Sequence, residues 1–137
     1  MLFLFISKEK EMLMIIEIDF NSGEALYMQL RNQIILGIAN ARYKEGDTLP
    51  SVRGLAEEIG INMHTVNKAY TVLKQEGFVK VDHRRGTVVA VNSDKLRAMQ
   101  EADRDLRVLI AKAGCKGITK DEIHQLIDEI YESYGGF

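Results

Sequence analysis

The sequence predicts a mainly helical α+β fold, and three observations support this prediction. Apolar residues recur at spacings of three or four, as on one face of a helix, in three successive segments, 25–41, 52–59 and 63–75. Two β-prone segments then flank a turn that contains Gly86. The helical spacing returns after Asn92 and continues almost to the end of the chain. Three helices and a hairpin predict a winged helix-turn-helix domain, which a short two-helix C-terminal region follows.

Composition places the chain among ordinary globular proteins. Its 137 residues are 46% hydrophobic and 28% charged, with a formal net charge of -2. This length favours one domain, or one domain with a small appendage. Residues 25–91 carry nine basic and six acidic side chains, whereas both flanking regions are acidic. A mildly basic middle between acidic ends fits a DNA-binding module with a separate interaction tail.

Cysteine usage and hydropathy indicate a reducing, cytoplasmic location. Cys115 is the only cysteine, so no disulfide can form within the chain. The apolar start, residues 1–6, is shorter than the roughly 20 residues that a membrane span needs. It also lacks the basic start of a signal peptide. We therefore expect no membrane partner.

Residues 1–24 form an N-terminal extension ahead of the predicted helices. Partial alternation over residues 15–20 predicts an extended segment, and a turn is expected at residues 21–23. The extension is therefore either an early strand or a set of surplus residues, in which case Met12 or Met14 is the true start.

The only proline of the chain introduces the strongest local signal. Pro50 cannot continue a helix, and Ser51 is a good N-cap for a new one. Gly60 ends this short helix, and Asn62 is a suitable cap for the next. Two short helices joined by a glycine turn predict a helix-turn-helix, whose second helix enters the major groove of DNA. Residues 25–91 are thus expected to form a winged helix-turn-helix DNA-binding domain.

Polar residues are expected on the face of the second helix that lies opposite its apolar stripe. They are His64, Thr65, Lys68 and, further along the helix, Thr71. Their size and hydrogen-bonding groups suit base edges and phosphates. Asn62 lies where a phosphate would meet the start of this helix. Polar helix faces are also often merely solvated, so an ordinary surface role stays open for each of these residues.

Arginines are expected to extend this surface on both sides. Arg53, near the start of the first motif helix, is placed either to bind a phosphate or to pair with a nearby carboxylate. The densest basic spot of the chain is the hairpin tip, with Arg84 and Arg85 in sequence before Gly86. Two arginines on a hairpin tip can reach the DNA backbone or a narrow minor groove. The alternative is a solvated turn.

Residues 92–137 are expected to form a helical dimerisation region. Gly114 and Gly117 are expected to end its first helix, and Thr119 with Glu122 forms a capping box at the start of its second. Two amphipathic helices cannot bury their apolar stripes alone, so they must pack on each other, on the winged helix or on a second copy of the chain. The candidate residues of the dimer interface are Leu106, Ile110, Ile127, Ile130 and Tyr131.

The central part of the chain resembles the GntR family of bacterial transcription regulators. The resemblance covers about residues 25–91 and rests on motifs at 25–30, 46–56 and 65–73. It implies DNA contacts by five residues, Arg53, His64, Thr65, Lys68 and Gly86. The short helical tail resembles the YtrA-like branch, whose C-terminal part serves chiefly dimerisation. The wing departs from the family pattern, because Arg84 stands where a glycine is usual.

The predicted function is that of a sequence-specific transcriptional regulator, a dimeric repressor that binds double-stranded DNA at a pseudo-palindromic operator. Two alternatives stay open: a winged-helix protein-interaction module and a nonspecific DNA binder. A small-molecule effector could bind at the dimer seam, although no residue identifies it. No catalytic, cofactor or metal site is expected. Asp121, His124 and Asp128 share a helix face, but such a group is usually only solvated.

Overall fold

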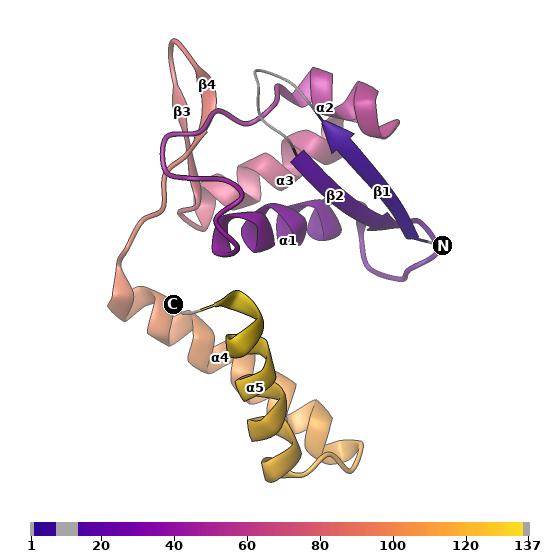
Figure 1. The fold of residues 1–137 in the computed structure, drawn as a ribbon, viewed down its shortest axis with the longest axis vertical. Coiled ribbons are helices and arrows are strands. Elements are labelled where there is room, and N and C mark those ends of the chain that lie inside the picture. The colour runs from indigo at the N-terminus through magenta and orange to yellow at the C-terminus, as the bar shows by residue number, and fades with distance from the viewer. Residues whose placement is uncertain (1, 8–13, 136–137) are drawn as a thin grey trace. The chain divides into compact units, whose positions relative to one another are not determined.

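The computed structural model describes residues 2–7 and 14–135 (Figure 1). The chain divides into an N-terminal unit, Met1–Asn92, and a C-terminal unit, Ser93–Phe137. The N-terminal unit holds a hairpin, three helices and a second hairpin, and the C-terminal unit holds two helices. The predicted mainly helical α+β fold is therefore confirmed.

The N-terminal unit begins with an antiparallel hairpin of β1 (Leu2–Ser7) and β2 (Met14–Asp19). Alternate side chains of β2 are fully buried in the main core: Met14, Ile16 and Ile18. The extended segment predicted near residues 15–20 is thus a strand that contributes to the core. Residues 1 and 8–13, which include Met12, lie outside the described part of the chain.

Three helices close over the same core: α1 (Leu26–Ala39), α2 (Val52–Ile59) and α3 (Met63–Gln75). Both predicted N-caps of the helix-turn-helix are confirmed. Ser51 Oγ accepts the N–H of Gly54 at 3.0 Å, and Asn62 Oδ1 accepts the N–H of His64 at 2.7 Å. Gly60 ends α2 with φ at 78°, in the left-handed region that glycine adopts without strain.

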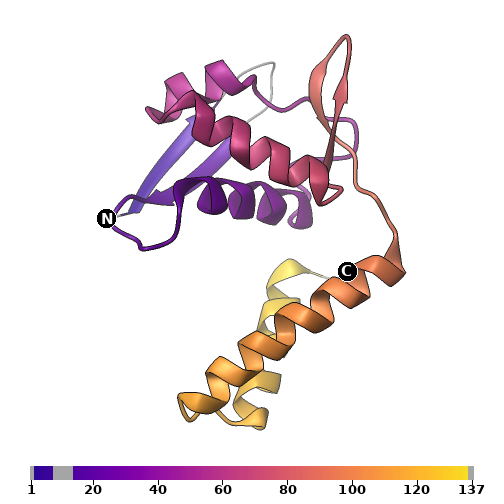
Figure 2. The ribbon, with the colours of Figure 1, turned by 180° about the vertical axis from the view of Figure 1, so that it is seen from behind.

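The second hairpin is the wing, formed by β3 (Val79–Asp82) and β4 (Gly86–Val89). The α1–α2 loop, residues 40–51, runs beside the wing in both views (Figures 1 and 2). The N–H groups of Gly46 and Leu49 donate to carbonyl oxygens of β4, each at 2.8 Å, and Val89 N–H donates to the oxygen of Asp47 at 2.8 Å. Part of the loop therefore pairs with β4 through an isolated antiparallel bridge between Thr48 and Val88.

Two tyrosines connect the α1–α2 loop to the helices. Tyr43 is buried, and its ring lies against Gly37 of α1. Burial raises the pKa of the Tyr43 hydroxyl above its ordinary value of 10.0. Tyr70 of α3 donates its hydroxyl hydrogen to the carbonyl oxygen of Pro50 at 2.7 Å, in a buried environment. The position of α2 relative to α3 is thus held through the loop as well as through the core.

The C-terminal unit consists of α4 (Lys95–Cys115) and α5 (Lys120–Tyr134). The capping box at the start of α5 is confirmed, with Thr119 and Glu122 each accepting the other's backbone N–H. The prediction that Gly114 ends α4 is wrong, because this glycine lies inside the last turn. One glycine costs a helix only about 1 kcal/mol, and the break comes at Gly117, where φ is 80°.

No helix in the described part of the chain is long and apolar enough to cross a membrane.

Candidate nucleic-acid interface

Helix α3 has one buried face and one polar face. The buried face consists of four apolar residues, Val66, Ala69, Tyr70 and Leu73. His64 and Lys68 are exposed, and Thr65 is partly buried at the edge of the polar face. The structure therefore places these three predicted contact residues in the first half of one helix, directly after the Asn62 cap.

The side chain of Lys68 is already engaged within the protein. Its Nζ lies 4.0 Å from the centroid of the Tyr27 ring, on α1. A cation–π contact at an exposed site contributes about 0.5–1 kcal/mol. Contact with DNA by Lys68 would thus be made from a position that Tyr27 restrains.

Sequence reasoning missed Asn67 as a member of this polar face. Asn67 is exposed, three residues after His64, and Thr71 follows at the next helical step. The Thr71 hydroxyl donates to the backbone oxygen of Asn67 at 2.8 Å, so the amide side chain of Asn67 is not used in that bond. A carboxamide can pair with the major-groove edge of adenine. The signal available in the sequence was the spacing of residues 64, 67 and 71.

Arg53 lies in the first turn of α2 and is exposed. It forms no ion pair with any residue that the structure describes. The expected alternative, a pairing of Arg53 with a nearby carboxylate, is therefore not observed among these residues. Its guanidinium is available to an anion that approaches the start of α2.

The wing tip is shaped by Asp82. Its Oδ1 accepts the backbone N–H groups of Arg84 at 2.8 Å and Arg85 at 3.0 Å. These two bonds hold the pKa of the Asp82 carboxyl below its ordinary value of 3.8. Gly86 follows with φ at 81°, which closes the turn. The carboxylate, which is charged at neutral pH, therefore stabilises the turn by accepting two of its backbone N–H groups.

The two wing arginines have different surroundings. The guanidinium of Arg84 is exposed and makes no hydrogen bond or ion pair within the described residues. Arg85 donates from Nη1 to the carbonyl oxygen of Gly46 at 3.0 Å, and its Nη2 lies 3.8 Å from Asp82 Oδ2. The structure thus leaves Arg84 open to solvent and engages Arg85 with the α1–α2 loop.

The C-terminal unit exposes most of its apolar surface. Within residues 93–135, Ala113 is the only buried apolar residue. Exposed fractions of the five predicted interface side chains range from 37% at Ile127 to 59% at Tyr131, and the others are Leu106, Ile110 and Ile130. The two helices therefore bury only a small part of their apolar stripes on each other.

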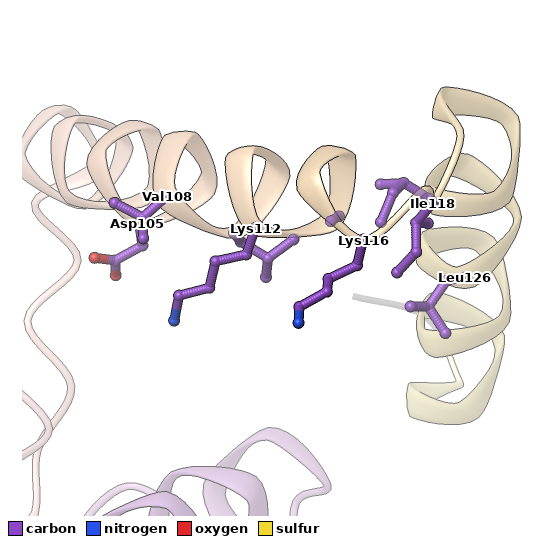
Figure 3. Close-up of a pocket in the computed structure, with 9 residues that line it drawn as sticks. Asp105, Val108, Lys112, Lys116, Ile118 and Leu126 are labelled. Atoms are coloured by element: carbon purple, nitrogen blue, oxygen red, sulfur yellow. The ribbon is translucent and has the colours of Figure 1, made fainter.

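A groove of about 640 Å³ lies beside the turn between α4 and α5 (Figure 3). Its apolar lining includes Val108, Ile118 and Leu126, and the side chains of Lys112 and Lys116 extend along its edge. The groove is open, and its lining residues belong to the same two helices as the exposed apolar residues described above. Within the described residues, no three His, Cys, Asp or Glu side chains are grouped to hold a metal ion.

Comparison with known proteins identifies the family. The model of the bacterial regulatory proteins of the gntR family matches residues 22–89. The HTH-type transcriptional repressor YtrA of Bacillus subtilis (strain 168) is 35% identical over 118 residues, which cover 84% of this chain and 91% of the relative.

Solved structures agree with this assignment. YtrA from Sulfolobus acidocaldarius, a GntR-family transcription factor, is 42% identical, with a TM-score of 0.54 over 86% of this chain and 97% of that one. A transcriptional antiterminator from Listeria monocytogenes EGD-e is 29% identical, with a TM-score of 0.77 over 88% and 92% of the two chains. The chain therefore belongs to the GntR family of bacterial regulatory proteins and is a DNA-binding transcriptional regulator.

Proposed function

We propose that the protein is a dimeric, sequence-specific repressor of transcription that binds a pseudo-palindromic operator. The observation that carries this proposal is the exposed polar face of α3, bounded by exposed arginines on α2 and on the wing. Each copy would place its α3 in the major groove of one half-site, with half-sites about one helical turn apart.

The proposed contacts divide into base readers and backbone binders. His64 and Asn67 lie on the exposed face of α3 and are the proposed base readers, because imidazole and carboxamide groups match base edges. Thr65 and Lys68 extend this face, with Lys68 approaching from the side of Tyr27.

Backbone contacts are proposed at three places around α3. Arg53 at the start of α2 and Arg84 at the wing tip supply exposed positive charge. The start of α3, at Asn62, presents N–H groups to a phosphate. Gly86 lets the wing backbone approach the duplex closely, since no Cβ stands there.

A second copy of the chain is the proposed partner of the C-terminal unit. A pair of helices with one buried apolar side chain leaves Leu106, Ile110, Ile127, Ile130 and Tyr131 in water, which is unfavourable in an isolated monomer. A two-fold pair would cover this surface and bring two N-terminal units together. We assign the groove of Figure 3 to the same contact and not to a small-molecule effector, because its apolar lining comes from the same two helices.

The repressor role rests on the similarity to YtrA of Bacillus subtilis, which covers 91% of that repressor. A cytoplasmic location accords with it, since Cys115 is exposed and unpaired.

Selection of bound duplexes from a random library tests this function. Enrichment of one inverted repeat, bound by two chains per duplex, is the expected result. Equal binding to all duplexes would instead make the protein a nonspecific DNA binder. Failure to retain any duplex, with the fold intact by circular dichroism, would favour a protein-interaction module.

A further inference from the structure

The α1–α2 loop links the wing to the helix-turn-helix. At one end of the paired segment, Gly46 receives the side chain of Arg85 on its carbonyl oxygen. At the other end, Leu49 pairs with β4 and is followed by Pro50, whose oxygen accepts the Tyr70 hydroxyl of α3. The wing tip is therefore connected to the helix that carries the proposed base readers through hydrogen bonds at both ends of loop residues 46–50.

The two wing arginines differ in the interactions within the protein that a bound phosphate would compete with. Arg84 has no side-chain partner within the described residues, so a phosphate can bind it without breaking any bond of the protein. Arg85 already donates one N–H to the Gly46 oxygen and its Nη2 lies 3.8 Å from Asp82 Oδ2, so its guanidinium is held toward the loop. A phosphate would compete with these two interactions for the guanidinium of Arg85, whereas it meets no competing partner within the described residues at Arg84.

We propose that Arg85 is a positioning residue that orients the wing relative to α3, and that of the two arginines only Arg84 contacts DNA. The claim that only Arg84 contacts DNA rests on the proposed function. The positioning role of Arg85 concerns the free protein and does not depend on that function. Arg85 acts by holding the wing tip against the α1–α2 loop, whose other end is tied to α3 through Pro50 and Tyr70.

Amide hydrogen exchange of the free protein tests the positioning role without any DNA. Arg85→Ala should speed the exchange of the Gly46 and Val89 amides about fivefold, the factor expected for the loss of one hydrogen bond. Arg84→Ala is the matched control, since it removes the same charge from the neighbouring position. It should leave both amides unchanged. Equal exchange in the two variants would overturn the positioning role.

The salt dependence of DNA binding tests the division between the arginines. Arg84→Ala should reduce the slope of log Kobs against log salt concentration by about 0.9, the value for one phosphate contact. Arg85→Ala should weaken binding at every salt concentration and leave the slope unchanged. A slope that falls equally in both variants would show that Arg85 also binds a phosphate, against the proposal.

The variant Asp82→Asn separates the effect of wing orientation on DNA binding from the effect of wing charge. The amide oxygen of asparagine can still accept the backbone N–H groups of the turn, whereas the ionic attraction to Arg85 is lost. The change makes the wing more positive, so a pure charge effect predicts tighter binding to DNA. Positioning predicts weaker binding, by about twofold for an exposed pair.

If the wild-type chain binds no duplex at all, the proposed function fails, and the exchange experiment still decides the role of Arg85.

Discussion

The ring of Tyr43 fills the space that a side chain at Gly37 would need. A Cβ added to Gly37 would lie 2.0 Å from Cε2 of Tyr43, well inside van der Waals contact. Tyr43 is buried and belongs to the main core, so its ring cannot simply turn out to solvent. This contact sets where the α1–α2 loop leaves α1, and with it the position of the strand-like segment beside the wing.

Gly37→Ala should therefore lower the free energy of unfolding by about 1–3 kcal/mol, as overpacked core sites do. Urea unfolding followed by circular dichroism measures the change. Gly23→Ala is the control, because nothing lies within 4 Å of a Cβ at that position. Its effect should stay within about 0.5 kcal/mol. Equal stability of the two variants would contradict the close packing of Tyr43.

Stability should fall in alkaline solution through the ionisation of Tyr43. Burial raises the pKa of its hydroxyl in the fold above the ordinary value of 10.0. The unfolded chain therefore loses this proton first as the pH rises, so the stability linked to the neutral hydroxyl is fully present below pH 10.0 and is lost as the pH rises through the folded pKa. Tyr43→Phe should flatten the fall in unfolding free energy that begins as the pH rises above about 10. An identical pH profile in wild type and variant would rule out this linkage.

Base preference should depend on the exposed face of α3. His64→Ala and Asn67→Ala should each reduce discrimination at one base pair of the half-site by about 1–3 kcal/mol. Competition binding against operator duplexes with single base changes measures this. Gln75→Ala, an exposed change in the last turn of the same helix, serves as the control. Uniform weakening on all duplexes would place both residues on the backbone instead.

Assembly should depend on the exposed apolar surface of the C-terminal unit. Ile110→Asp should raise the dimer dissociation constant roughly 10- to 100-fold, since it removes the burial of one large aliphatic side chain. Sedimentation equilibrium measures the constant. Gln100→Asp, an exposed polar position on the same helix, should leave it unchanged. A wild-type chain that stays monomeric at all concentrations would contradict the proposed pairing.

Local signals in the sequence were enough to predict α2 and α3. Pro50 and Ser51 mark the start of α2, Gly60 marks its end, and Asn62 caps α3, so the predicted spans of 52–59 and 63–75 agree with the structure. Each of these effects acts within a few residues along the chain, which is why the pattern could be read without knowledge of the fold.

Contacts between distant segments could not be predicted in the same way. The α1–α2 loop has no strand pattern, yet residues 46–49 pair with β4 because the core brings them alongside. Lys68 has the spacing of a solvent-facing residue, and only the packing of α1 places Tyr27 beside it. Arg84 and Arg85 are indistinguishable in sequence, and the tertiary position of Gly46 separates them. Such relations depend on side chains that meet only after folding.

Helices α4 and α5 bury very little apolar surface between them. This affects how operator occupancy would depend on the concentration of the regulator. If pairing of two chains completes the structure of these helices, the amount of competent dimer grows with the square of the chain concentration when chains are scarce. A twofold change in gene expression would then alter operator occupancy by up to fourfold. A short helical tail of this kind can thus turn small differences in copy number into a sharper transcriptional response.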